Sequence, residues 1–476
     1  MEKLTGRTAE QKQLTDILNS PQAELVAILG RRRVGKTFLI RSVYKDYMAF
    51  EFSGIHDAPL KEQLQNFSLA LGQVAKSPPA AVPASWLMAF TYLQQYLSPR
   101  LKKQKQVIFF DEFPWIQTPR SGFLSAFSHF WNTWASRQKN LKVVICGSAA
   151  SWMIKNVVNN KGGLHNRITQ RIRLMPFMLG EVEDYLASRQ VKLDRYQLLQ
   201  LYMALGGIPQ YLNSIKPGES ATQIIDRLCF TKDGFLKSEF KNLYHSLFDN
   251  PDHHIAIIKA LAKQGKGLSR REVIETCGLS SGGTATKILD ELSESGFITP
   301  YIPMGKHTKD AIYRLTDEYS LFYLKYIDKS RASGAGTWYK IAETPSWRSW
   351  SGIAFESICL KHIYQIKKAL GIGGVYRQES TWRYMSGNDQ GCQIDLLIDR
   401  RDGCINICEM KFYTAPFSIS IDYADALRKK MEIFKARTKT RKTLLLTMVT
   451  TTAITQNINY TGLVQNEITM DALFEK

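Results

Sequence analysis

The feature that most constrains this chain is an eight-residue, glycine-containing pattern between two apolar segments. Residues 30–37 read Gly-Arg-Arg-Arg-Val-Gly-Lys-Thr, which matches Gly-x-x-x-x-Gly-Lys-[Ser/Thr]. The apolar run 24–29 before it is typical of a buried strand, and a helical pattern begins at Thr37. A strand, a glycine-rich turn and a helix in this order predict a P-loop, whose backbone N–H groups surround nucleotide phosphates.

Each position of this pattern has a chemical reason. The glycines let the backbone wrap the phosphates, Lys36 is expected to reach the β- and γ-phosphates of ATP, and the Thr37 hydroxyl is expected to help hold Mg²⁺. The predicted nucleotide-binding residues of the loop are Gly30, Arg31, Arg32, Arg33, Val34, Gly35, Lys36 and Thr37.

A second apolar run, 107–110, ends in the carboxylates Asp111 and Glu112. Functional sites of open α/β sheets lie at such strand ends. We therefore expect Asp111 to position the metal and Glu112 to activate the attacking water. The plainer alternative is a strand that ends in an exposed acidic turn.

Residues 1–235 alternate apolar runs with helical patterns, which predicts an α/β domain with a parallel sheet and a helical lid. This half resembles the AAA+-like ATPases, specifically the archaeal-type predicted ATPases that are also grouped with the STAND NTPases. The resemblance rests on Gly6-Arg7 with Glu10, the P-loop, Asp111-Glu112-Phe113, Cys146-Gly147-Ser148, Arg167, Met175-Pro176-Phe177 and Gly206-Gly207-Ile208-Pro209-Gln210-Tyr211.

The resemblance implies that Ser148 senses the γ-phosphate and that Arg167 acts as an arginine finger. Asn166 stands where such proteins often carry glycine, so a solvated, structural Arg167 stays open as an alternative.

Residues 236–335 show three short helical patterns followed by two strand-like runs, 297–301 and 311–315, on either side of a polar tip. A capping box at 269–272 opens the second helix and Gly278 ends it. This order predicts a winged helix-turn-helix, which contacts nucleic acid through its third helix and its wing. The candidate contact residues are Thr284, Thr286, Lys287, Lys306 and Lys309.

The third helix of this segment also carries Asp290, Glu291 and Glu294 and no arginine. Arginine makes the commonest base-specific contact in DNA recognition. An interdomain coupler therefore stays open as the alternative role of the winged helix.

Residues 345–476 are predicted to form a third domain: a helix over 352–370, three strands, a helix over 423–434 and a strand over 443–448. Glu356 lies on the first helix, Asp395 on an apolar strand, and Glu409 and Lys411 on the same side of the next strand.

This order and the Glu…Asp…Glu-x-Lys set resemble the PD-(D/E)xK nucleases, the restriction-endonuclease-like fold. Asp395 and Glu409 would then bind a divalent metal, with Lys411 and Glu356 completing the catalytic set. An inactive nuclease-like domain, or a plain Glu409–Lys411 salt bridge, is the alternative.

The net charge indicates the kind of partner. Lys and Arg number 63 against 43 Asp and Glu, a formal charge of +20. A positive field of this size attracts polyanions, so we expect nucleic acid, DNA first, with RNA left open. No leader or membrane-spanning run is visible and the seven cysteines are scattered, which predicts a cytoplasmic protein without a membrane partner.

Taken together, the sequence predicts an ATP- and Mg²⁺-dependent enzyme that acts on DNA through a metal-dependent nuclease-like domain. The alternative is a nucleotide-operated switch or scaffold whose nuclease-like domain only binds. A homo-oligomer is compatible with either reading.

Overall fold

The computed structural model describes residues 4–76, 81–148, 150–158, 162–248, 250–280, 282–330, 334–375, 377–384 and 391–476. The chain divides into two compact units. The first unit comprises Met1–Pro176 with Leu247–Asp249 and Glu294–Gly296, and the second comprises Phe177–Ser246, Asn250–Ser293 and Phe297–Lys476. We describe each unit by itself.

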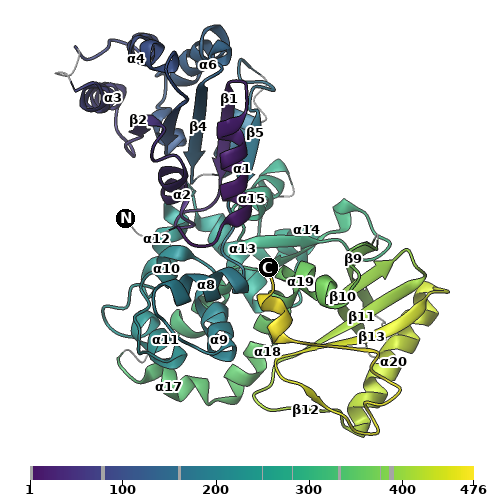
Figure 1. Ribbon diagram of the computed structural model, residues 1–476. Helices are drawn as coiled ribbons and strands as arrows, with labels where there is room; N and C mark the ends of the chain where they lie inside the picture. The colour runs from purple at the N-terminus through teal and green to yellow at the C-terminus, as the bar shows by residue number, and fades with distance from the viewer. Residues whose placement is uncertain are drawn as a thin grey trace. The chain divides into compact units, whose positions relative to one another are not determined.

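The first unit is built on a five-stranded parallel sheet in the order β2-β3-β4-β1-β5 (Figure 1). The strands are β1 (Glu24–Leu29), β2 (Met48–Ser53), β3 (Gln106–Asp111), β4 (Leu141–Gly147) and β5 (Gln170–Arg173). Strands β1, β3 and β4 are buried along their whole length, which explains their continuous apolar sequence. The predicted α/β fold with a parallel central sheet is confirmed.

Helices flank this sheet, and aromatic side chains fill much of the space beneath them. The longer helices are α1 (Thr8–Asn19), α2 (Lys36–Val43), α3 (Leu60–Ala75), α4 (Trp86–Leu101) and α6 (Phe123–Thr133). Phe90 of α4 stacks on Phe130 of α6, and Phe52 of β2 meets Trp86 edge to face. This core holds the carboxyl ends of the strands in place.

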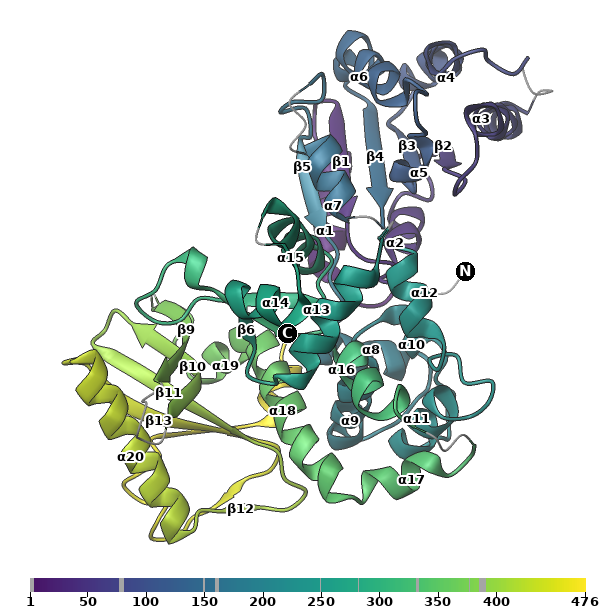
Figure 2. The ribbon, with the colours of Figure 1, turned by 180° about the vertical axis from the view of Figure 1, so that it is seen from behind.

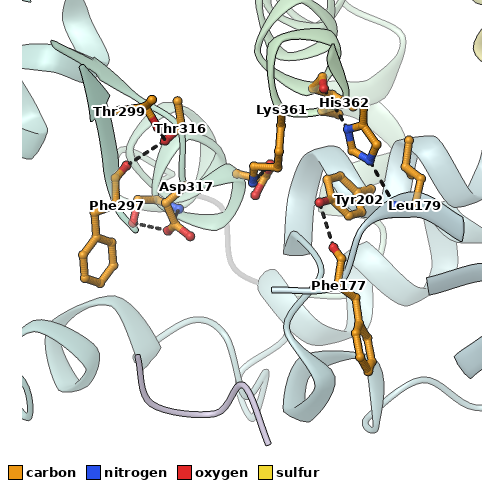
Figure 3. A network of polar contacts seen from close by, with 12 residues as sticks. Phe177, Leu179, Tyr202, Phe297, Thr299, Thr316, Asp317, Lys361 and His362 are labelled. Atoms are coloured by element: carbon orange, nitrogen blue, oxygen red, sulfur yellow. Dashed lines mark hydrogen bonds and ion pairs between the residues drawn. The ribbon is translucent and has the colours of Figure 1, made fainter. Parts of the chain in front are cut away.

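The second unit begins with a helical segment. Its helices are α8 (Leu179–Ser188), α9 (Arg195–Leu205), α10 (Pro209–Leu212), α11 (Ala221–Cys229) and α12 (Glu239–His245). The Tyr202 hydroxyl of α9 donates to the Phe177 carbonyl at 2.9 Å (Figure 3), and the Phe177 N–H donates to the Gly207 carbonyl at 2.7 Å. The second contact joins the Met175-Pro176-Phe177 and Gly206-Gly207 motifs.

The next elements follow the predicted order of three helices and two strands, with one short additional strand, β6. They are α13 (Asp252–Lys263), β6 (Leu268–Ser269), α14 (Arg270–Cys277), α15 (Gly283–Glu294), β7 (Ile298–Tyr301) and β8 (Ile312–Leu315). Ser269 caps α14 in a capping box with Glu272, and Gly278 ends the helix with a positive φ of 61°. The strands form an antiparallel sheet in the order β6-β8-β7.

The last part of the chain forms a mixed sheet in the order β15-β13-β11-β10-β9. Its strands are β9 (Arg377–Tyr384), β10 (Cys392–Arg400), β11 (Cys404–Lys411), β13 (Thr443–Thr450) and β15 (Asn466–Thr469). Strands β10 and β11 form an antiparallel hairpin. Helix α20 (Ile421–Thr438) lies along this sheet (Figure 2) and buries Leu427 and Phe434 in its core.

The expectation of one helix over 352–370 is wrong. The structure has two helices, α18 (Pro345–Lys361) and α19 (Ile363–Ala369), because His362 leaves the helical conformation at φ −101° and ψ 29°. The start is also earlier, because Thr344 caps α18 and Pro345 occupies its first position.

In the part of the chain that the structure describes, no helix combines the length and the apolar character that crossing a bilayer requires.

Candidate functional site

The P-loop of the first unit turns back on itself at the carboxyl end of β1. Gly35, with φ 89°, precedes α2, and the buried Lys36 ammonium donates to the carbonyls of Gly30 at 2.8 Å and Arg31 at 3.0 Å. A side chain at Gly30 would come within 2.5 Å of the Leu174 carbonyl oxygen, so the close approach of that backbone explains the first glycine.

The acidic end of β3 meets the start of α2. The Thr37 hydroxyl donates to one oxygen of Asp111 at 2.8 Å. The other oxygen accepts from the Cys146 thiol at 2.8 Å and the Glu112 N–H at 2.9 Å. Burial raises the pKa of the Cys146 thiol, and the nearby Asp111 adds to the effect, so the thiol keeps its proton and donates it.

Glu112 lies directly beyond the end of β3 in a left-handed conformation, at φ 44°. Its carboxylate accepts from the Ser148 hydroxyl at 2.8 Å and the Ser148 N–H at 3.2 Å. Because β3 and β4 are neighbouring parallel strands, the residues that follow each of them meet at one edge of the sheet. The structure therefore brings Thr37, Asp111, Glu112 and Ser148 together, as the predicted site requires.

These residues fit a magnesium-bound nucleotide. Mg²⁺ prefers oxygen ligands and is held in nucleotide sites by one or two protein groups besides phosphate and water. The Thr37 hydroxyl and the Asp111 carboxylate, in contact next to the P-loop, supply such oxygens.

Arg7 supports the P-loop from outside, and Arg32 joins the loop to Trp115. Arg7 is buried and donates to the Val34 carbonyl at 3.2 Å, while its guanidinium pairs with Glu10 at 3.5 Å. The Arg32 guanidinium lies 5.7 Å from the centre of the Trp115 ring. Arg7 belongs to the Gly6-Arg7 match, but its hydrogen bond to the Val34 carbonyl could not be predicted from the sequence.

Arg167 is placed away from the loop. It is exposed in a turn that precedes β5, and its N–H donates to the Leu164 carbonyl. Because β5 runs parallel to β1, this turn lies at the opposite end of the strands from the P-loop, about 20 Å away over six residues of strand. Arg167 therefore does not reach the P-loop of its own chain.

The predicted acidic residues of the last sheet also converge. Leu396 of β10 pairs with Cys408 of β11, and one further step in this antiparallel register sets Asp395 opposite Glu409. The pairing of β10 with β9 shifts between Ile394 and Leu397, so Asp395 lies in a bulge, a common device next to functional sites. Burial raises the pKa of Glu356 on α18 to about 8, and the nearby Asp395 charge adds to the effect.

Protein cations and polar groups surround two of these carboxylates. Asp395 accepts from Arg314 of β8 and from the amide of Gln393, each at 2.8 Å. Glu409 accepts from Lys430 and from the Tyr423 hydroxyl of α20, each at 2.7 Å, and its carboxylate is 3.4 Å from the Lys411 ammonium.

This pairing decides the charge state of Glu409. Burial by itself would raise the pKa of Glu409, but the ammonium groups of Lys430 and Lys411 outweigh it and lower that pKa. Within the described ranges, no three His, Cys, Asp or Glu side chains are arranged to hold one metal ion. In this arrangement Arg314 and Lys430 pair with the carboxylate oxygens of Asp395 and Glu409 that a divalent cation would use.

Sequence reasoning missed the partners of these carboxylates. Tyr423 and Lys430 are seven residues apart, so they share one face of α20, and Gln393 shares a strand face with Asp395. Those spacings could have identified Tyr423, Lys430 and Gln393 as candidate partners of the carboxylates. The pairing of Arg314 with Asp395 could not be predicted, because nothing in the sequence around Arg314 indicates a partner 81 residues away.

The candidate nucleic-acid residues of the second unit lie at its surface. Thr284, Thr286 and Lys287 are exposed on α15, and Lys306 and Lys309 are exposed between β7 and β8. The loop that carries the two lysines also contacts the last sheet, where the Met304 N–H donates to the Thr381 carbonyl at 2.9 Å. The segment 252–315 and the last sheet are therefore in direct contact within this unit.

The strand order, the P-loop and the two carboxylates at the end of β3 give the first unit the fold of a P-loop ATPase domain. Residues 4–215 match the model of an ATPase domain found predominantly in Archaea. An uncharacterized protein of Methanocaldococcus jannaschii is 23% identical over 394 residues, covering 82% of this chain and 83% of that protein.

Two solved structures match this chain at lower sequence identity. A Walker-type ATPase of Pyrococcus abyssi matches with a TM-score of 0.50 at 16% identity, covering 68% of this chain and 96% of that one. The ORC2 protein of Aeropyrum pernix, solved as ADPNP and ADP complexes, matches with a TM-score of 0.39 at 14% identity, covering 68% and 94%.

Proposed function

We propose that this chain binds and hydrolyses ATP with Mg²⁺ and that it acts on nucleic acid, DNA in the first instance. The observation that carries the ATPase proposal is the 2.8 Å hydrogen bond between Thr37 and Asp111, which joins the P-loop to the acidic end of β3. These are the two groups that a magnesium-bound triphosphate needs side by side.

Each residue of the site then has a role. The P-loop N–H groups and Lys36 bind and orient the phosphates, and Thr37 with Asp111 would hold Mg²⁺, which offsets phosphate charge when bound. Glu112 takes the proton of the attacking water. Ser148 holds the Glu112 carboxylate through its hydroxyl and its N–H, which supports the proposal that this residue couples the γ-phosphate position to the base.

The binding step is tested with Lys36→Ala. This substitution removes the ammonium that neutralises the β- and γ-phosphates, and we expect ATP affinity to fall by at least about a hundredfold. Fluorescence titration with a labelled ATP analogue measures it, and Lys12→Ala, an exposed lysine of α1, is the control. Unchanged affinity in Lys36→Ala would contradict a P-loop role for this segment.

Arg167 can serve as an arginine finger only if it acts on the P-loop of another copy of the chain. Arg167 lies at the far end of the strands from its own P-loop, so it would have to act on the P-loop of a neighbouring copy. If the rate of ATP hydrolysis per chain rises with protein concentration, and this rise is lost in Arg167→Ala, a homo-oligomer of this kind is supported.

The nucleic-acid part of the proposal is supported by the formal charge of +20 and by the exposed polar and basic residues of α15 and the β7–β8 loop. We propose that residues 236–335 form a winged helix and residues 345–476 a PD-(D/E)xK nuclease-like domain, after an ATPase region over 1–235. Asp395 and Glu409 are its proposed metal ligands, and Glu356 and Lys411 complete the set.

A second candidate function is a nucleotide-operated switch or scaffold whose nuclease-like domain binds without cutting. The observation in its favour is that Arg314 and Lys430 already pair with Asp395 and Glu409. Incubating plasmid and single-stranded DNA with Mg²⁺ or Mn²⁺, with and without ATP, separates the two. Cleavage that is lost in Asp395→Ala and Lys411→Ala supports the nuclease, and nucleotide-dependent binding without cleavage supports the switch.

A further inference from the structure

The contact between Arg314 and Asp395 joins two predicted domains at the acidic site. Arg314 belongs to β8, the second strand of the wing, and Asp395 belongs to β10 of the last sheet. The guanidinium nitrogen lies 2.8 Å from the carboxylate oxygen, and the Arg314 side chain is only 6% exposed. A charge-assisted hydrogen bond at such a shielded place is stronger than one in solvent.

The same wing is held against the sheet at a second point. The Met304 N–H donates to the Thr381 carbonyl of β9, and Pro303 forms a parallel bridge with Thr381. Arg314 is also stabilised from within the wing, since its guanidinium lies 5.7 Å from the centre of the Tyr301 ring. The wing therefore packs against the last sheet at two points, and one of them is the contact between Arg314 and Asp395.

The ion pair is incompletely satisfied for such a buried place. The Arg314 Nε atom and the Gln393 Oε1 atom are both buried, and neither has a hydrogen-bond partner among the described residues. Buried polar groups of a permanent structural contact are normally paired. Two buried polar atoms beside one carboxylate therefore lack the hydrogen bonds that a permanent structural contact normally makes.

Asp395 is one of the two proposed metal ligands, and continuing the β10–β11 register by one step sets it opposite Glu409. A divalent cation and a guanidinium cannot both occupy the same carboxylate oxygen, because the two positive charges repel each other and compete for the same lone pairs. Lys430 pairs with Glu409 in a similar way, but it belongs to the same domain as its partner. Arg314 is the cation that comes from another predicted domain.

We propose that Arg314 of the wing is an internal counter-ion that keeps divalent cations off Asp395, so that the acidic site opens only when β8 withdraws from β10. This inference rests on the proposed metal site and adds its regulation. A movement of the predicted winged helix, for example when it engages nucleic acid, would then be required before a metal ion can bind.

The test is Mn²⁺ binding to the full chain without nucleotide, followed by electron paramagnetic resonance of free Mn²⁺. We expect Arg314→Gln to bind Mn²⁺ about tenfold more tightly than the wild type, because no ion pair has to be broken first. Arg314→Lys keeps the charge and should stay close to wild type. Asp395→Asn should abolish this binding in either background, which identifies the site.

The matched control is Lys442→Gln. Lys442 pairs with Asp399, which lies on β10 four residues after Asp395. Lys442→Gln therefore removes an ion pair of β10 but leaves the contacts of Asp395 in place. Equal Mn²⁺ affinity in wild type and Arg314→Gln, with binding still dependent on Asp395, would overturn the inference and leave the metal site standing. Absence of Asp395-dependent binding in every variant would overturn both.

A measurement on the unmodified protein covers the case in which Arg314→Gln does not fold. Saturating Mn²⁺ should displace Arg314 from Asp395 and loosen β8, so amide hydrogen exchange over Ile312–Leu315 should become faster in the wild type and not in Asp395→Asn. Exchange in β8 that Mn²⁺ leaves unchanged, while Mn²⁺ binds, would contradict the inference.

Discussion

The roles proposed for Asp111 and Glu112 are reflected in their different hydrogen bonds. Asp111 uses both oxygens, one toward Thr37 and one toward Cys146 and its neighbour's N–H, so it is held in place by protein groups. Glu112 instead accepts from Ser148 through one oxygen. This difference matches a fixed metal-positioning carboxylate beside a carboxylate that handles a proton.

The distinction predicts the effect of Glu112→Gln. The amide keeps the size and polarity of the side chain but cannot take a proton, so ATP affinity should be retained and hydrolysis should fall by about a hundredfold or more. Phosphate release and nucleotide titration measure the two quantities. Glu62→Gln, on the exposed first turn of α3, is the control, and hydrolysis equal to wild type in Glu112→Gln would remove this residue from the role of base.

His362 is a buried titratable residue outside both sites. Its ring accepts from the Leu179 N–H at 3.1 Å through Nε2 and contacts the Ile358 carbonyl at 2.8 Å through Nδ1 (Figure 3). Burial lowers the pKa of His362 to about 3 from its ordinary 6.5, against the opposing effect of the Ile358 carbonyl. A neutral ring with the proton on Nδ1 satisfies both contacts.

This lowered pKa predicts a loss of stability in acid. Between pH 6.5 and about 3 the unfolded chain binds a proton that the folded chain excludes, so the free energy of unfolding falls as the pH falls through that window. The slope from this one residue is at most about 1.4 kcal/mol per pH unit. Urea unfolding at pH 7 and pH 5 should show a smaller pH dependence in His362→Gln than in wild type, and equal dependence would contradict the assignment.

At the scale of elements, the junction between α9 and α10 depends on close backbone approach. Gly206 has φ 65°, and a Cβ atom on Gly207 would overlap the Phe177 carbonyl oxygen. The Phe177 N–H donates to the Gly207 carbonyl from the other direction. The two segments can approach in this way only where the side chain is a hydrogen atom.

Gly207→Ala should therefore lower the free energy of unfolding by about 1–3 kcal/mol, as overpacking does in other interiors. Gly352→Ala is the matched control. Gly352 lies inside α18 with open space around its Cβ position, so alanine there should be neutral or stabilising by up to about 1 kcal/mol. Urea unfolding monitored by circular dichroism measures both, and equal stabilities would contradict the packing argument.

Helix α18 links several features of the second unit. It carries Glu356 of the acidic site, and its last residue, Lys361, pairs with the buried Glu318 of α16 (Glu318–Phe322). His362 follows directly and bonds to the N-terminus of α8. Glu318 comes four residues after Arg314, so one short segment pairs with both β10 and α18.

At the scale of the whole molecule, the charge of +20 predicts a strong salt dependence of nucleic-acid binding. Each lysine that neutralises a phosphate adds about 0.9 to the slope of log affinity against log salt concentration for duplex DNA. Lys306→Gln with Lys309→Gln should therefore reduce that slope by up to about 2. Lys192→Gln, an exposed lysine of the lid segment, is the control, and a slope unchanged by the double substitution would remove the wing from the interface.

The features that the sequence determined by itself are local. The P-loop, its flanking strand and the caps of α14 at Ser269 and Gly278 follow from residues within a few positions of one another, because turns, caps and strand burial are short-range effects. The alternation in β11 likewise placed Glu409 and Lys411 on one side. The P-loop residues and the acidic set could therefore be named without coordinates.

Only the tertiary structure decided the contacts between distant segments. Arg314 meets Asp395 across 81 residues, and His362 meets Leu179 across 183. The break between α18 and α19 lies at the same residue, because His362 leaves the helical conformation where its ring bonds to the Leu179 N–H. Such contacts depend on how whole helices and strands pack against each other. The sequence close to either residue does not predict which distant residue it will contact.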